Sequence, residues 1–155
     1  MANTEETRVP QRRNSEQERG RQAWEAIREI QQHHNDSLEK EYRSLVRRLN
    51  TMIQVNGLGQ TLGFLKAKGK NDSNRAQHLL LKHLTEWMSV PHHFATENRA
   101  PIDQGYDGLL RWITDEGTTS TDYRRATTEC LAFGIWLRRF AEGELKEPDN
   151  EEGLL

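Results

Sequence analysis

Apolar residues recur along this chain at spacings of three and four, and nowhere in a sustained alternation with polar residues. Spacings of three and four place side chains on one face of an α-helix, whereas alternation is typical of a half-buried strand. The pattern therefore predicts an all-α protein, a compact bundle of about six helices. With 155 residues the chain fits a single domain that is large enough to bury a core.

End signals place the helices along the chain. A capping box at Ser15–Glu18 predicts the start of a first helix that runs to about His33. Asp36 is expected to cap a second helix, whose apolar face reaches Leu49. Residues 89–101 form the longest irregular connection, which is expected to be exposed or functional. Further helices are predicted at residues 76–88, at 102–114, and after a second capping box at 119–122.

Three glycines follow a short β-branched run in MIQVNGLGQTLGFLKAKGK, residues 52–70. A dinucleotide-binding turn would need a strand before it and a second strand, carrying an acid, after it. The second strand is missing, and the nearest acid, Asp72, lies in a predicted turn. The sequence therefore does not support a nucleotide site here.

The same stretch is better interpreted as a corner between helices. Asn56 and Gly57 are expected to end one short helix, and Leu58 to begin the next. Gly59 and Gly63 then fall on one face of that next helix. Since glycine weakens a helix by about 1 kcal/mol relative to alanine, we expect another backbone, of protein or of nucleic acid, to approach closely at both positions.

The near-neutral net charge of −2 hides a strong asymmetry. Between Arg43 and Lys82, eight basic residues accompany one acid, whereas six acids accompany one lysine from Glu142 onward. These features predict a disordered arm at residues 1–14, a helical domain at 15–145 and an acidic disordered tail at 146–155.

The basic block predicts a polyanionic partner, bound through the sugar-phosphate backbone because no exposed aromatic residues interleave with the cations. Such binding is independent of sequence and depends strongly on salt. The candidate phosphate contacts are Arg47, Arg48, Lys66, Lys68, Lys70, Arg75 and Lys82. Arg43, Arg138 and Arg139 are less well defined candidates.

Other chemistry has weaker support. The six histidines lack the spacing of metal ligands, so neither a metal nor a cofactor is expected. Cys130 falls at a core-facing position and is interpreted as a small buried apolar residue. Arg28 and His33 have the Arg-x4-His spacing of one class of helical, metal-independent ribonucleases, which is the enzymatic alternative. A third possibility is a helical adaptor that binds an acidic protein.

No stretch resembles a signal peptide, and no window approaches the roughly 18 apolar residues of a membrane span. With a single cysteine that can form no internal disulfide, these observations favour a cytoplasmic location.

The chain resembles the small all-helical subunit of type III-B CRISPR effector complexes, the Cmr complexes, in MIQVNGLGQTLGFLKAKG. YRSLVRRLNT before this stretch, and AQHLLLKHL and CLAFGIWLRRFAEGEL after it, extend the resemblance from about Gly20 to Leu145. Its most specific part is NGLGQTLGFL with the lysines behind it.

The resemblance implies a non-catalytic, structural subunit of an RNA-guided complex in antiviral defence. A few copies would stack into a minor filament, with their basic face along the guide–target duplex, while other subunits cleave RNA. The implied partners are the backbone filament subunits, the large subunit, copies of the chain itself, guide RNA and target RNA. Arg43, Arg138 and Arg139 would then face either RNA or a neighbouring subunit.

Overall fold

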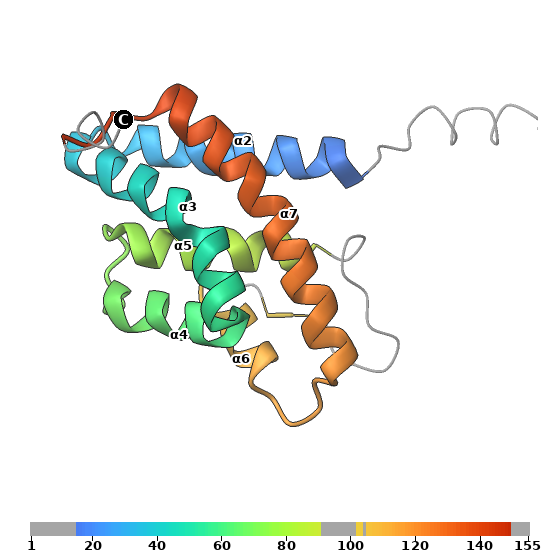
Figure 1. The fold of residues 1–155 in the computed structure, drawn as a ribbon. Coiled ribbons are helices and arrows are strands. Elements are labelled where there is room, and N and C mark those ends of the chain that lie inside the picture. Colours follow the sequence, from blue (N-terminus) through green and yellow to red (C-terminus); the bar gives the residue numbers. More distant parts are fainter. Residues whose placement is uncertain (1–14, 91–101, 104, 150–155) are drawn as a thin grey trace, which may run out of the picture.

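The computed structural model describes residues 15–90, 102–103 and 105–149. The expected arm at 1–14, most of the 89–101 connection and the end of the tail at 150–155 lie outside the described residues. Across the described ranges the chain forms six α-helices and no strand, which confirms the all-α prediction (Figure 1). They are α2 (Ser15–Gln32), α3 (Asp36–Asn56), α4 (Leu58–Gly69), α5 (Ala76–Met88), α6 (Gly108–Ile113) and α7 (Ser120–Glu144).

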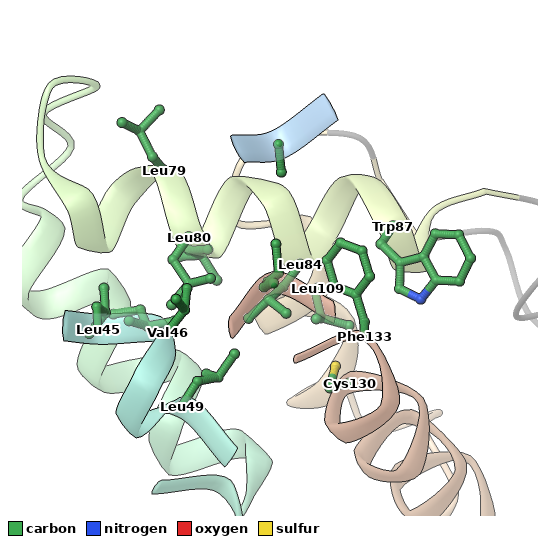
Figure 2. Packing of buried hydrophobic residues seen from close by; sticks show 14 of the residues in the cluster. Leu45, Val46, Leu49, Leu79, Leu80, Leu84, Trp87, Leu109, Cys130 and Phe133 are labelled. Atoms are coloured by element: carbon green, nitrogen blue, oxygen red, sulfur yellow. The ribbon is translucent and has the colours of Figure 1, made fainter. Parts of the chain in front are cut away.

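The long helix α7 holds the bundle together. It packs along both α2 and α3, while α4 and α5 form an antiparallel pair against α3 (Figure 1). Figure 2 shows the core between these layers, where Leu80 of α5 points toward Val46 of α3. The Trp87 ring stacks on the Phe133 ring of α7, with centroids 5.3 Å apart. Burying each such side chain contributes about 1.5–3 kcal/mol, which makes this layer the main source of stability.

The helix starts follow local capping, with one difference from expectation. Thr119 caps α7 by accepting from the Asp122 amide at 3.1 Å, as predicted. The cap of α3 is Asn35 and not Asp36, because the Asn35 side chain accepts from the Leu38 amide at 3.1 Å. Asp36 instead places its negative charge in the first turn, where it favours the helix dipole.

Two predicted elements change in length. The second helix continues without a break to Asn56, so the expected separate short helix before Gly57 is wrong. The corner itself is confirmed, because Gly57 has a φ of 86° and its amide donates to the Ile53 carbonyl at 2.9 Å. The helix predicted at 102–114 shortens to α6, and at its first residue, Gly108, the Asp103 backbone lies so close that no side chain would fit.

The glycines of α4 differ in their surroundings. At Gly59 a side-chain hydroxyl approaches rather than a backbone, and the Gly59 amide donates to the Tyr123 hydroxyl at 2.8 Å. Gly63 has open space beside it among the described residues, so no protein backbone approaches it there, and approach by a nucleic-acid backbone stays a prediction. The close approach to a backbone lies at Gly69, where an added Cβ would sit 2.9 Å from the His78 nitrogen.

Candidate nucleic-acid interface

The seven candidate cations do not share one face of the folded chain. Arg47 and Arg48 are consecutive on α3, so their side chains point about 100° apart. Lys66 and Lys68 lie in the last turn of α4, and the remaining candidates follow at its end and along α5. The continuous basic block of the sequence is therefore spread over α3, the end of α4, the turn that follows it and α5.

Lys66 is held in place by groups from the turn before α6. Its ammonium group donates to Asp107 Oδ2 at 2.9 Å and to the Tyr106 hydroxyl, and it lies 4.5 Å from the Tyr106 ring centroid. These hydrogen bonds, first with Tyr106 and then with Asp107, raise the pKa of Lys66. It also donates to Asn71 at 3.1 Å. Lys66 thus fastens α4 to the segment that leads into α6.

Lys82 is also engaged within the chain. Its ammonium lies 2.6 Å from Glu29 of α2 and 3.5 Å from Glu86 of α5. The other Glu29 oxygen lies 2.6 Å from His83 Nε2, and the Tyr42 hydroxyl lies 2.7 Å from His83 Nδ1. This network of five residues, in which Tyr42 and His83 are buried, connects α2, α3 and α5.

Two shifted pKa values, those of Tyr42 and Glu29, bear on where the protons lie in this network. Burial raises the pKa of Tyr42, so its hydroxyl keeps the proton and donates to His83 Nδ1. The hydrogen bond from His83, with help from Lys82, lowers the pKa of Glu29 to about 2. His83 satisfies both neighbours when its Nδ1 accepts from the Tyr42 hydroxyl and its Nε2 donates to the Glu29 carboxylate. The ion pair of Lys82 therefore belongs to a network that joins helices, which a local sequence pattern does not reveal.

Three candidates remain exposed and form no ion pair or side-chain hydrogen bond within the described part of the chain. They are Arg48, Lys68 and Lys70. Lys70 follows α4 in the left-handed conformation, with a φ of 50°, and Lys68 precedes it in the last turn. Cations are favoured here because helix carbonyls at a C-terminus carry partial negative charge. Arg75, by contrast, lies 3.6 Å from Asp72 in an exposed ion pair.

Arg47 points about 100° away from Arg48 around α3. It lines a groove of about 730 Å³ between α3 and α7. Arg138 and Arg139 line the same groove, together with the exposed Ile135. Arg138 lies 2.8 Å from Glu142, so the three arginines leave an excess of positive charge there. The structure thus brings Arg47 together with the two arginines that the sequence left less well defined.

Arg43 has a structural role at the end of α7. It donates to the carbonyl oxygens of Glu142 at 3.0 Å and Leu145 at 3.3 Å, and lies 3.9 Å from the Glu147 carboxylate. Two carbonyls at a helix end, which lack partners within the helix, are thereby satisfied.

The enzymatic alternative gains no geometric support. Arg28 is exposed and lines a shallow hollow of about 250 Å³ with Trp24 and His34, while His33 follows the end of α2 and is not part of that lining. A separation of five residues directs two helical side chains about 140° apart. Cys130 is fully buried, as predicted, and burial raises the pKa of its thiol.

The described residues contain no group of three or more His, Cys, Asp or Glu side chains that could hold a metal ion. None of the helices in the same ranges is long and apolar enough to cross a membrane.

Fold and surface together define a small all-helical protein with a cationic corner at the end of α4 and an arginine-lined groove between α3 and α7. The family model described as CRISPR-associated protein (Cas_Cmr5) matches residues 15–144, and the chain belongs to this family. It is therefore a CRISPR-associated subunit of the Cmr, or type III-B, class, which confirms the resemblance seen in the sequence.

Proposed function

We propose that this chain is a non-catalytic, structural subunit that stacks with copies of itself into the minor filament of a cytoplasmic Cmr complex. There it supports the binding of guide RNA and target RNA beside the backbone and large subunits. Membership of the Cas_Cmr5 family supports the place in a Cmr complex. The proposed RNA contact rests on one observation, the exposed cations at the end of α4 that form no ion pair in the described structure.

Lys68, Lys70 and Arg48 are the principal proposed contacts, because binding a phosphate there disrupts no ion pair in the described structure. Lys66, Arg75 and Lys82 are secondary contacts, since each would exchange a carboxylate partner for a phosphate. Arg47 would contact RNA from the other flank of α3. Guide–target pairing would read the sequence, while these cations would respond to charge and shape.

The test uses the assembled Cmr complex with a chain that carries Lys68→Glu and Lys70→Glu. Each lost phosphate contact removes about 0.7 from the slope of log affinity against log salt, so the slope should fall by at least about 1.4. Target RNA retention at moderate salt should fall roughly tenfold. The matched control, Arg21→Glu with Arg124→Glu, reverses two exposed cations elsewhere and should retain RNA normally. Retention that is equal in both complexes would contradict the proposed contacts.

The non-catalytic role is tested on the purified chain. Incubation with single-stranded RNA should give no cleavage, and His33→Ala should change nothing. Cleavage that disappears in the variant would establish the ribonuclease alternative. Co-purification from the native source should recover a small guide RNA and repeat-type backbone proteins, whereas an acidic protein without RNA would favour the adaptor.

A further inference from the structure

The chain after α7 turns back and lies beside the first half of α3 (Figure 1). Its start is fixed by Leu145, which is buried, and by the Lys146 amide, which donates to Glu39 Oε1 at 3.0 Å. The segment 146–149 is therefore docked on the helical body, although the sequence predicted a disordered tail from 146 onward.

The acids of this docked segment meet cations of α3. Asp149 lies 3.0 Å from the Lys40 ammonium, and Glu147 lies 3.9 Å from the Arg43 guanidinium. Lys40, Arg43 and Arg47 follow one another at spacings of three and four, so they share one flank of α3. We call Lys40, Arg43 and Arg47 the basic flank of α3.

The basic flank continues into the groove between α3 and α7. Arg47 lines that groove beside Arg138 and Arg139, and Lys40 lies about 10 Å further along the helix axis. Together they form one elongated cationic surface on α3 and α7. At one end of this surface two carboxylates of the same chain pair with its cations, Asp149 with Lys40 and Glu147 with Arg43.

The ion pairs that hold residues 147–149 against α3 are weak. The Asp149 side chain is 84% exposed and that of Glu147 is 49% exposed, and ion pairs in such positions contribute little and are screened by salt. The anchor at Leu145, by contrast, is apolar and buried. A competing polyanion can therefore displace residues 147–149 without disturbing the end of α7. These residues also lie beyond the part of the chain that matches the family.

We propose that the basic flank of α3 and the adjoining groove form a second surface for the RNA backbone, and that residues 146–149 are an intramolecular competitor covering its end. This inference rests on the proposed function, since it requires that the chain bind RNA. Arg43 remains engaged with the α7 carbonyls, so Lys40 is the main cation that the competitor hides.

The experiment measures binding of a labelled single-stranded RNA of mixed sequence to the full chain by fluorescence anisotropy, over a range of salt. Glu147→Gln with Asp149→Asn should bind about three- to tenfold more tightly than the native chain, with a salt slope steeper by about 0.7 for each uncovered cation. The control, Glu16→Gln with Glu25→Gln, removes two exposed carboxylates from α2 and should change affinity by less than about twofold.

Lys40→Ala decides whether the gain comes from the basic flank. Added to Glu147→Gln with Asp149→Asn, the tail variant, it should abolish most of the gain in RNA affinity. Alone it should have little effect, because Lys40 is already paired with Asp149. The inference is overturned if the tail variant binds like the native chain, if the α2 control gains as much, or if the gain survives Lys40→Ala. Preferential binding of an acidic peptide over RNA by the uncovered surface would also overturn it.

The same assay separates the two proposals. If Lys68→Glu with Lys70→Glu leaves binding intact while the tail effect persists, the contacts at the end of α4 are wrong and the competitor stands. If the tail effect is absent while the lysine variant loses binding, the competitor is wrong and the proposed function stands. RNA binding by none of the variants would refute both.

Discussion

Gly63 and Gly69 of α4 provide a matched pair for testing how closely this helix packs. An alanine Cβ at Gly63 would meet open space among the described residues, whereas at Gly69 it would lie 2.9 Å from the His78 nitrogen and 3.1 Å from its Cα. The atoms that would have to move at Gly69 are backbone, which cannot yield without shifting α5 against α4. The same substitution should therefore have opposite effects at the two sites.

The magnitudes follow from two opposing terms. Alanine favours an interior helical position over glycine by roughly 0.5–1 kcal/mol, so Gly63→Ala should stabilise the chain by that amount. Gly69 is the last residue of α4 and gains less from helix propensity, while overpacking costs about 1–3 kcal/mol. The net expectation for Gly69→Ala is a loss of about 1–2 kcal/mol.

The stability of both variants is measured by thermal and urea unfolding, monitored by circular dichroism. For a chain of this size 1 kcal/mol corresponds to about 2–4 °C, so Tm should rise by about 2 °C for Gly63→Ala and fall by about 4 °C for Gly69→Ala. Equal stabilisation by the two substitutions would refute the close approach of α4 and α5 at Gly69.

Two further predictions concern Glu29 and Cys130. Because the pKa of Glu29 is lowered to about 2, its ion pairs stabilise the fold fully above pH 4.5, and this contribution is lost as pH falls from 4.5 through 2. Glu29→Gln should therefore lower the free energy of unfolding by about 1–2 kcal/mol at pH 7, a value discounted because a third of the side chain is exposed. The difference in unfolding free energy from the native chain, measured in urea, should disappear in acid. A difference that is independent of pH would contradict the ionised network. Cys130 should react with a thiol reagent only in denaturant, because it is fully buried and its thiol pKa is raised; rapid labelling of the native chain would show that α7 opens.

The sequence predicted those parts of the fold that local chemistry decides. The six helices, the cap at Thr119 and the corner at Gly57 all depend on neighbours within four residues. The shortening of α6 was not predictable in this way, because no side-chain capping hydrogen bond marks its start at Gly108, and the close contact of Gly108 with the Asp103 backbone is seen only in the folded chain. The unbroken course of α3 through 51–55 was missed because a β-branched run has no clear helical preference until it is packed.

For the candidate site, the sequence identified cations but not their partners. Glu29, Asp107 and Glu147 all lie outside the basic block and neutralise parts of it only after folding. Counting charges within a window therefore overstates what the folded surface presents. One signal was available, since an acidic C-terminal segment of opposite charge is a natural partner for cations elsewhere in the chain.

The pairing of Lys66 with Asp107 also has a consequence for the order of events during synthesis. Asp107 lies 41 residues after Lys66, so at about 5–20 residues per second the ribosome adds it roughly two to eight seconds later. Glu147, which meets Arg43, is added later still. During that interval the growing chain carries these cations without their eventual partners. Its non-specific attraction to nucleic acid is therefore stronger while these cations lack their partners, and it weakens once Asp107 and Glu147 have been added.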